Sequence, residues 1–475
     1  MKARDTLIFI IIVFAFLGGI GALFPKEGIS FGSRELYFPS INDIVSGSHS
    51  TAAFRRLQEI EERLRLQRHR DSLYVDTLSF YTEFFQENPI RISLPDDDWN
   101  YFHDFFAALD SCHERHEIVR VLHYGDSQIE SDRITGYIRQ ELQKKFGGKG
   151  PGLLPVVQAV PSYSVGQSAS ENIERYIVSG MHQNRASHGR YGVLGQLGTF
   201  NGESTISVNA YSGNTACENV RGFQTIRLFT GRSNNFKVQL NLPGKETVKD
   251  TLTSDASAVK VHTWNLPAPV NKFSLSMSGS GEIYGIAADG ISGVAFDNIP
   301  FRGSSGTFFN TLDSVVMASM LKHLNVRLIL LEFGGNTAPF VRDKKAIASY
   351  CNNLSKQIDY LKKVCPEAKI LMIGPSDMST KVNGKLSTYP YLPLLVEAMK
   401  EAALQSGAAF WNMYEAMGGH NSMIEWVRHS PALAAPDYIH FTTKGTERIA
   451  ALFCETLMVY YDYYCFKNEN TSSNP

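Results

Sequence analysis

The sequence lacks any excess of charge of one sign, because 46 Lys and Arg residues balance 47 Asp and Glu residues and the formal net charge is −1. Proteins that bind nucleic acid through its phosphates usually carry a clear excess of positive charge. We therefore predict no nucleic acid partner. With 475 residues, of which 43% are hydrophobic, the chain can bury a sizeable core and form more than one domain.

Cysteine is scarce, with only 6 residues in the whole chain. Their spacing, at positions 112, 217, 351, 365, 454 and 465, matches no zinc site. Residues 112–117 combine a cysteine with two histidines, but the charges crowded there before an apolar run are typical of a solvated linker. We predict neither a metal nor another cofactor, and the disulfide pairing stays open.

Long apolar runs are also scarce, and the most pronounced one lies at residues 7–24. Lys2 and Arg4 precede this run and Pro25 ends it. Its length suits a helix that spans a membrane, although small residues near its end leave signal cleavage open. We predict a membrane anchor with the rest of the chain facing the periplasm or cell exterior, and secretion after cleavage is the alternative.

Two familiar motifs are missing. The glycine-rich run at residues 147–152 lacks the Gly-Lys-Ser/Thr of a phosphate-binding loop, so a flexible loop is the better interpretation. The Gly-x-Ser-x-Gly motif is also absent, which weighs against an ordinary α/β-hydrolase.

The most informative stretch that is present covers residues 118–128. An apolar, β-branched run followed by Gly125-Asp126-Ser127 predicts a buried strand that ends in a sharp turn. Helical spacing over residues 133–146 places Ser127 near a helix N-terminus, at the strand end where open α/β sheets bind ligands. A lone Gly-Asp-Ser is often only a turn and a helix cap, so other groups must decide whether Ser127 is a nucleophile.

Strand and helix patterns alternate again towards the C-terminus. We expect strands at 326–333, 368–373 and 408–413, and helices at 344–363, 391–405 and 445–464. This alternation predicts a parallel sheet covered on both faces, whose first strand carries Ser127. From about residue 162 to 289 the apolar period changes to two, which predicts an inserted all-β sandwich.

These patterns give a plan for the whole chain. We predict a signal anchor or transmembrane segment over 1–30, a connector and helical stalk over 31–112, an α/β domain over 113–161 and 293–466, an inserted β-sandwich over 162–292, and a disordered tail over 467–475.

Polar residues follow several of the predicted strands. Asp437 stands three residues before His440, a spacing that lets the carboxylate hold Nδ1 and leaves Nε2 free to act as a base. Asn336 follows the strand at 326–333 and so lies at the same sheet edge as Ser127. Gly303 follows the inserted domain and can bring a backbone N–H close to a ligand. Together these residues could supply a nucleophile, a base, an acid and oxyanion donors.

These stretches resemble the blocks of the SGNH, or GDSL, hydrolase family, a three-layer α/β fold whose members are mostly esterases. The resemblance rests on Tyr124-Gly125-Asp126-Ser127-Gln128, Phe333-Gly334-Gly335-Asn336 and Asp437-Tyr438-Ile439-His440, and it extends over residues 118–464. Within the family the chain is most similar to bacterial peptidoglycan O-acetylesterases, whose β-sandwich insertion resembles a carbohydrate-binding module.

The resemblance implies a role for each candidate residue. Ser127 would be the nucleophile, His440 the base and Asp437 the acid that orients it. The amides of Ser127 and Gly303 and the side chain of Asn336 would hold the oxyanion.

Other residues fit the family less closely. The block around Gly303 departs from the family pattern, so Gly306 is the alternative donor. His123 and His323 lack catalytic neighbours in the sequence, and we interpret both as structural. Three tryptophans could stack on sugar rings, although tryptophan is more often a core residue: Trp264, Trp411 and Trp426.

The sequence thus predicts a serine esterase that removes O-acetyl groups from a cell-envelope polysaccharide, with peptidoglycan as the leading candidate, through an acyl-enzyme. The partners would be the acetylated polysaccharide and, through the N-terminal helix, the membrane. One alternative is a polysaccharide O-acetyltransferase, because both reactions share the acyl-enzyme and sequence cannot separate water from an alcohol as acceptor. A second alternative is a non-catalytic protein that binds glycan through its β domain.

Overall fold

The structure is a computed structural model that describes residues 29–31, 34–36, 58–59, 62 and 77–472, apart from 181–182, 213–214, 245–247 and 252–258. The chain divides into two compact units, Met1–Glu59 and Ile60–Pro475. In the first unit, strands β1 (Ile29–Phe31) and β2 (Arg34–Leu36) form an antiparallel hairpin. Among the described residues, we find no helix with the length and apolarity needed to cross a membrane. The predicted anchor at 7–24 lies outside the described residues. The predicted connector and stalk over 31–112 is wrong in its last part, because Ile92–Ser93 pairs with the α/β sheet and the helix His103–Ser111 packs on that domain.

The second unit contains the predicted parallel sheet, in the order β14-β4-β15-β16-β19-β3. Five of its strands run parallel, and the short edge strand β3 is antiparallel to β19. Nearly every residue of the central strands is buried, which explains why they appear in the sequence as continuous apolar runs. Their bounds are β3 Ile92–Ser93, β4 Ile118–Gly125, β14 Gly293–Pro300, β15 Val326–Glu332, β16 Lys369–Ile373 and β19 Ala409–Trp411.

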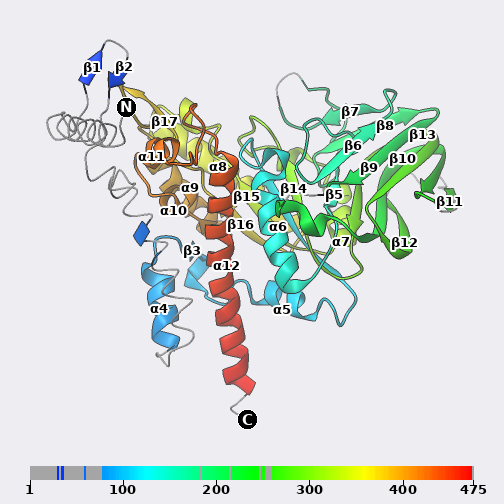
Figure 1. The fold of residues 1–475 in the computed structure, drawn as a ribbon, viewed down its shortest axis with the longest axis horizontal. Helices are drawn as coiled ribbons and strands as arrows, with labels where there is room; N and C mark the ends of the chain where they lie inside the picture. The colour runs from blue at the N-terminus through cyan, green and yellow to red at the C-terminus, as the bar shows by residue number, and fades with distance from the viewer. Residues whose placement is uncertain are drawn as a thin grey trace, which may run out of the picture. The chain divides into compact units, whose positions relative to one another are not determined.

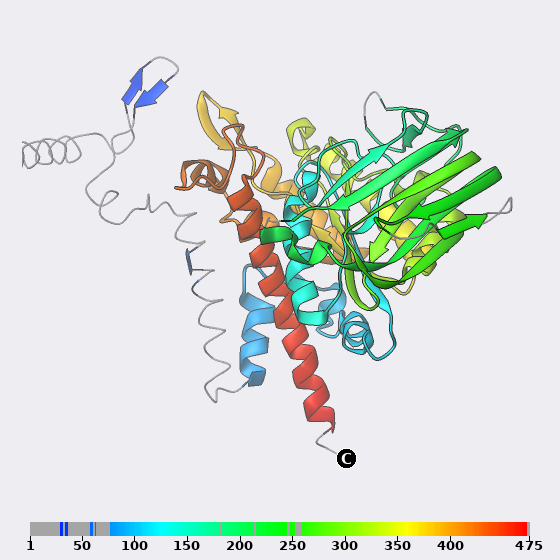
Figure 2. The same ribbon diagram turned by 45° about the vertical axis from the view of Figure 1, so that its right-hand side comes forward.

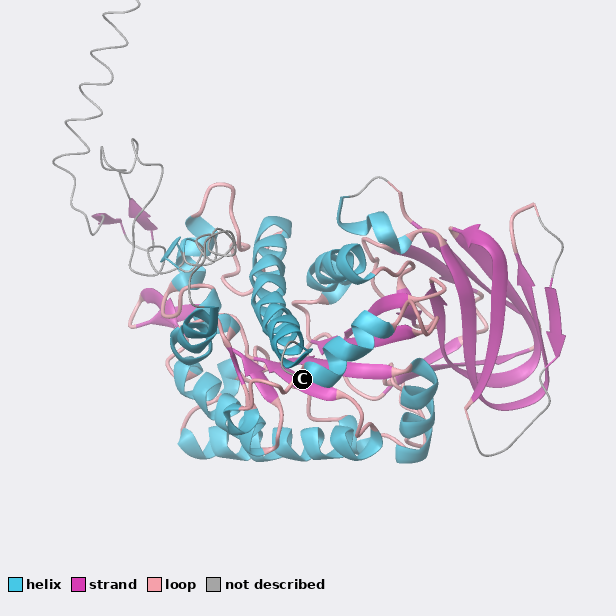
Figure 3. Cartoon of the chain, turned by 90° about the horizontal axis from the view of Figure 1, so that it is seen from below, coloured by secondary structure: helices cyan, strands magenta, loops and turns pink. Residues whose placement is uncertain are grey.

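Helices lie on both sides of this sheet (Figure 3). One group packs together as α7, α8 and α9, and its core includes Leu122 and Tyr124 of β4. The other group is built around α12, which contacts α5 and α6 (Figure 1). Their bounds are α4 Thr77–Glu87, α5 His103–Ser111, α6 Arg133–Phe146, α7 Ser314–Leu324, α8 Lys344–Val364, α9 Leu392–Gln405, α10 Met413–Ala416, α11 Ser422–Arg428 and α12 Thr443–Ser472.

The order of the strands creates a natural binding position. From β4 the chain passes through the β domain to β14 on one side, and then through α7 to β15 on the other side of β4. The connections therefore diverge between the carboxyl ends of β4 and β15, and open α/β sheets bind ligands at such a point. Ser127 follows β4 and Asn336 follows β15, so both predicted site residues lie at this edge.

The inserted domain is an all-antiparallel nine-stranded sheet that folds over on itself (Figure 2). Its predicted start at residue 162 is wrong, because β5 (Gly152–Leu154) already pairs with β13. Two long strands with bulges, β10 and β13, run through both layers, and their apolar side chains enclose a separate core. On β10 the alternate residues Phe236, Val238 and Leu240 are buried, as the predicted period of two requires, because alternate residues of a strand point to one face. Its strands are β5 Gly152–Leu154, β6 Val165–Ala169, β7 Glu174–Ile177, β8 Gln196–Asn201, β9 Ser204–Ala210, β10 Phe223–Asn241, β11 Val248–Thr251, β12 Lys260–Val270 and β13 Lys272–Asp289. A small hairpin, β17 (Ser379–Val382) with β18 (Lys385–Thr388), lies apart from both sheets.

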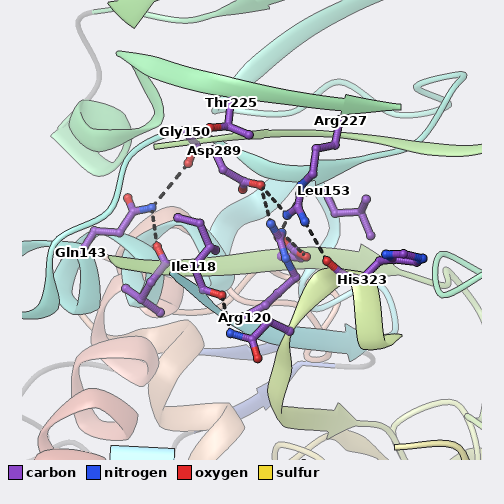
Figure 4. Close-up of polar contacts among 12 residues, drawn as sticks. Ile118, Arg120, Gln143, Gly150, Leu153, Thr225, Arg227, Asp289 and His323 are labelled. Carbon is purple, nitrogen blue, oxygen red and sulfur yellow. Dashed lines mark hydrogen bonds and ion pairs between the residues drawn. The ribbon is translucent and has the colours of Figure 1, made fainter. Parts of the chain in front are cut away.

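A buried ion cluster joins the two sheets (Figure 4). Arg120 of β4 contacts Asp297 of β14 at 2.7 Å and Asp289 of β13 at 2.6 Å, and all three side chains are fully buried. Arg227 of β10 also contacts Asp289, at 3.0 Å, while the amide of Leu153 donates to Asp297 at 2.9 Å. Two cations thus face two carboxylates, and side chains from both sheets are held in one hydrogen-bonded group.

Several expectations are corrected by the structure. All three tryptophans are buried, at 6%, 1% and 2% exposure for Trp264, Trp411 and Trp426, so the sugar-stacking alternative is wrong for each. Helix α12 continues to Ser472, through much of the segment predicted as a disordered tail, because its polar residues extend a solvent-exposed helix and Asn470 donates to the carbonyl of Phe466. Five cysteines are free thiols: Cys112, Cys351, Cys365, Cys454 and Cys465.

Candidate active site

Ser127 lies in a tight turn after β4. A Cβ atom on Gly125 would come within 2.9 Å of the buried Ile129 side chain, so any larger residue here would have to displace that side chain. The sequence suggested that this turn leads directly into the helix, but in the structure it does not. Ser131 and Asp132 adopt left-handed backbone conformations, with φ of 64° and 67°, and α6 begins only after them. Ser127 is therefore presented by a loop and not by the first turn of α6.

The structure brings Ser127, His440 and Asp437 into one hydrogen-bonded series. Ser127 Oγ lies 2.9 Å from His440 Nε2, and His440 Nδ1 lies 2.7 Å from Asp437 Oδ2. Because an ionised carboxylate can only accept hydrogen bonds, Nδ1 carries the proton and Nε2 is left to accept the hydroxyl proton of Ser127. This is the arrangement that nucleophilic catalysis by serine requires.

The surroundings of Asp437, whose side chain is 46% exposed, favour its ionised form. Burial raises the pKa of this carboxyl group, but the hydrogen bond from the His440 ring and two backbone hydrogen bonds together bring the pKa below its ordinary value. The two backbone donors are the amides of Ile439 and His440, each 3.0 Å from Oδ1. The carboxylate is thus fixed in the orientation that holds the imidazole.

Two residues that the sequence analysis did not single out connect the serine loop to the histidine loop. Gln128 Nε2 donates to the carbonyl of Ile439 at 2.7 Å. Arg133 donates to the carbonyl of Ser127 at 2.7 Å and to that of Phe441 at 3.2 Å. Gln128 belongs to the recognised motif, whereas no pattern near Arg133 indicates a partner 308 positions away.

The two candidate glycines differ in what surrounds them. Gly303 has φ of 75° and open space where a Cβ would lie, and it lines the cavity that contains Ser127. Gly306 lies against the ring of Phe333, and its amide donates to Ser304 Oγ at 3.2 Å. The backbone amide of Gly303 is therefore the better placed oxyanion donor of the two.

The side-chain amide of Asn336 lines the same cavity, but its Nδ2 is already engaged. It donates to Asp126 Oδ2 at 3.0 Å and to the carbonyl of Ser304 at 3.1 Å. An oxyanion carries more charge than a carbonyl oxygen, so it could draw one of these hydrogens towards itself. Catalytic hydrogen bonds commonly become well aligned only once the substrate is bound.

Ser127, Gly303, Asn336 and His440 all line one cavity of about 300 Å³. This volume is at the lower end of the usual range for small-molecule sites. Asp437 lies behind His440 and does not line the cavity. Within the described part of the chain, no cluster of His, Cys, Asp and Glu could hold a metal ion.

No protein-family model and no curated protein matches the sequence. Among solved structures, the chain is similar to a peptidoglycan O-acetylesterase, with 21% identity over 76% of this chain and 96% of that chain and a TM-score of 0.61. The two chains share a fold, and the predicted parallel α/β sheet with an additional antiparallel β domain is confirmed. A family two carbohydrate esterase from Cellvibrio japonicus also matches, with 10% identity over 63% of this chain and 99% of that chain and a TM-score of 0.25.

The surroundings of His123 and His323 agree with the prediction that both are structural. His123 is fully buried on β4, between Glu332 Oε2 at 3.1 Å and Thr135 Oγ1 at 3.0 Å. His323 lies in the last turn of α7, where its backbone carbonyl accepts from Arg227. Neither ring lines the cavity that contains Ser127.

Asp126 should make the stability of this fold depend on pH. Burial, the largest effect, and the charge of Glu332 together raise its pKa from 3.8 to about 7, against the lowering effect of the hydrogen bonds from Gln128 and Asn336. Because the folded state binds this proton more tightly than the unfolded chain, its contribution to the free energy of unfolding falls as pH rises from about 4 to about 7. Asp126→Asn removes this titration, so the variant should gain stability relative to the native protein between pH 5 and pH 8.

The measurement is urea denaturation of both proteins at the two pH values. Asp96→Asn, at an exposed position, controls for the loss of a surface carboxylate. An identical stability difference at pH 5 and pH 8 would contradict the prediction.

Proposed function

We propose that the protein is a serine esterase that removes O-acetyl groups from a cell-envelope polysaccharide, with peptidoglycan as the first candidate. The observation that carries the proposal is the series from Ser127 through His440 to Asp437, with contacts of 2.9 and 2.7 Å, beside a cavity that Gly303 and Asn336 also line. The shared fold with a structure described as a peptidoglycan O-acetylesterase supports the choice of polymer.

In the first half of the reaction, Ser127 Oγ attacks the acetyl carbonyl carbon while His440 Nε2 takes the hydroxyl proton. Asp437 stabilises the imidazolium through Nδ1–H. The amides of Ser127 and Gly303 and the side chain of Asn336 stabilise the oxyanion. The C–O bond to the sugar then breaks, the sugar oxygen takes the proton from His440, and the acetyl group stays on Ser127.

In the second half, a water molecule replaces the sugar. His440 Nε2 takes a proton from the water as its oxygen attacks the acetyl-serine carbonyl. The bond to Ser127 Oγ breaks, Oγ recovers its proton from the imidazolium, and acetate leaves. A sugar hydroxyl in place of this water would give acetyl transfer.

The test is to measure the acid that the full chain releases from three substrates, with Ser127→Ala in parallel: acetate from O-acetylated peptidoglycan and from acetylated xylan, and the fatty acid from a long-chain ester. We expect the fastest release from peptidoglycan. Acetylated product formed on an added glycan acceptor would instead favour the transferase. Absence of hydrolysis of all three substrates, together with tight glycan binding, would favour the non-catalytic alternative.

Removing the side-chain amide of Asn336 should reduce turnover strongly. Asn336→Ala should lower kcat for acetate release on the order of 100- to 1000-fold, with a small change in KM, because the amide acts mainly on the charge that develops in the transition state. Asn100→Ala, which removes an exposed amide that lines neither cavity described here, serves as the matched control. An unchanged kcat in a folded Asn336→Ala protein would remove Asn336 from the oxyanion site.

We also propose that residues 7–24 hold the enzyme at the membrane, with its active site facing the periplasm or cell exterior. The apolar composition of this segment and the cell-envelope substrate support the proposal. The full chain should be recovered in the membrane fraction, and a chain that starts after residue 30 should not. Equal distribution of both would contradict it.

A further inference from the structure

A second cavity lies at the junction between the parallel sheet and the β domain. Its volume is about 320 Å³, and the polar residues that line it come from both sheets. The end of β14 and the segment after it supply one wall. Strands β6, β7 and β8 supply the opposite wall, with the side chains of Gln167, Arg175 and Gln196 among them.

This junction cavity adjoins the catalytic cavity. Arg302 lines both, and the next residue, Gly303, lines the catalytic cavity beside Ser127. Phe301 lines the junction cavity and Gly303 lines the catalytic cavity. Because Cα atoms two residues apart are separated by at most about 7 Å, the two cavities are about one sugar ring apart at this point. A glycan chain with one residue at Ser127 could therefore place a neighbouring group in the junction cavity.

Arg175 gives this cavity an unbalanced positive charge. Its guanidinium donates to two neutral side-chain oxygens, Gln196 Oε1 at 2.8 Å and Gln183 Oε1 at 3.0 Å. Burial lowers the pKa of Arg175, and no carboxylate offsets that effect. The buried Arg139 nearby differs, because both of its terminal nitrogens contact Asp132. A half-buried guanidinium with only amide partners is suited to receive a carboxylate from a ligand.

The same cavity contains a buried acceptor that has no donor. Gln167 Nε2 donates to the carbonyl of Pro155 at 2.8 Å, while its Oε1 is buried without a hydrogen-bond partner among the described residues. A buried oxygen without a hydrogen-bond donor destabilises the folded protein, because it has lost its hydrogen bonds to water. A ligand that donates an N–H or O–H to it would remove this cost. Of the arginines that line the cavity, Arg139 is paired with Asp132 and Arg302 with Glu130, so the cavity presents the Arg175 guanidinium and the Gln167 acceptor to the same ligand.

We propose that the junction cavity binds a carboxylate-bearing group next to the acetylated sugar, with Arg175 contacting the carboxylate and Gln167 Oε1 accepting a hydroxyl or amide hydrogen. This inference rests on the proposed esterase function and gives it a substrate class, an acidic acetylated glycan. The carboxylate could belong to a uronic acid in the chain or to a peptide attached to it, and both present the same group to Arg175.

The test compares KM and kcat of the full chain and its Arg175→Gln variant. The substrates are acetylated peptidoglycan fragments with their peptides, the same fragments with the carboxylates amidated, an acetylated oligosaccharide containing a uronic acid, and nitrophenyl acetate. We expect KM for at least one carboxylate-bearing substrate to rise about ten-fold or more in the variant, with kcat unchanged. The amidated fragments and nitrophenyl acetate should not change, and whichever acidic substrate responds identifies the source of the carboxylate.

Two further variants separate charge recognition from damage to the fold. Gln183→Glu keeps Arg175 but gives its guanidinium a resident carboxylate, so it should raise KM for the acidic substrate in the same way. Arg221→Gln removes an exposed arginine of the same domain and should leave every KM unchanged. An unchanged KM for both acidic substrates in Arg175→Gln and Gln183→Glu would overturn the proposal.

Failure of the cavity proposal can be distinguished from failure of the esterase function. If Ser127→Ala abolishes hydrolysis but Arg175→Gln leaves both acidic substrates unaffected, only the cavity proposal is wrong. If the native chain hydrolyses no ester, the cavity proposal can still be tested by measuring the binding of the peptide-bearing fragments by calorimetry. Weaker binding by Arg175→Gln than by Arg221→Gln would support the cavity, and equal binding would overturn it.

Discussion

Replacing Ser127 by alanine should lower acetate release from O-acetylated glycan by on the order of 10⁴-fold or more. In the proposed mechanism the Ser127 hydroxyl forms the covalent bond to the acetyl group, and it lies 2.9 Å from His440 Nε2, the base that takes its proton. Without the hydroxyl, water must attack the ester directly, assisted only by His440 and the oxyanion donors. The expected loss is therefore in kcat, while substrate binding is retained.

Ser376→Ala provides a matched control for this prediction. Ser376 lines the same cavity, but its hydroxyl contacts Gln128 and not the imidazole. Its replacement should reduce turnover far less than that of Ser127. Equal turnover in Ser127→Ala and the native enzyme, measured as acetate released per mole of folded protein, would show that Ser127 is not the nucleophile.

Most of the α/β framework could be predicted from the sequence because its elements are amphipathic or fully buried. The bounds of α6 agree with the predicted helix, and β15, β16 and α8 begin and end within a few residues of their predicted bounds. The site residues could be named because each follows a recognisable strand or precedes a recognisable helix. These residues converge because the carboxyl ends of parallel strands lie at one edge of the sheet. The alternation of strands and helices in the sequence already predicts such a parallel sheet.

What the sequence could not provide depends on contacts between distant segments. Arg133 gave no signal because its partner at Phe441 is defined only once the last helix is in place. Arg175 is one polar residue in an alternating strand, and only the folded chain, in which β7 and the end of β14 line one cavity, shows that its side chain lies there without a carboxylate partner. The course of β10 and β13 through two layers likewise depends on bulges that no single residue type marks.

The ion cluster at the junction gives the largest expected effect on stability. Replacing Arg120 by methionine should lower the free energy of unfolding by about 3 to 5 kcal/mol, because it leaves buried carboxylates without their shared cation. Asp289 would keep Arg227 at 3.0 Å, whereas Asp297 would retain only the amide of Leu153 as a donor among the contacts described above. The surface salt bridges of the chain, in contrast, are each worth at most about 1 kcal/mol.

The charge balance of the cluster provides the internal control. The double variant Arg120→Met with Asp297→Asn removes one charge of each sign, keeps an acceptor for Leu153, and should recover part of the stability lost by Arg120→Met alone. Burial already raises the pKa of Asp297 in the native protein, so protonation of this carboxyl group should relieve the single variant and make its loss smaller at pH 5 than at pH 8. Urea denaturation of the three proteins at both pH values measures these differences. Removal of a cation from between buried carboxylates must lower the free energy of unfolding if those charges hold the two sheets together. A loss below about 1 kcal/mol in Arg120→Met, or no recovery in the double variant, would therefore mean that apolar packing and not the cluster holds the sheets together.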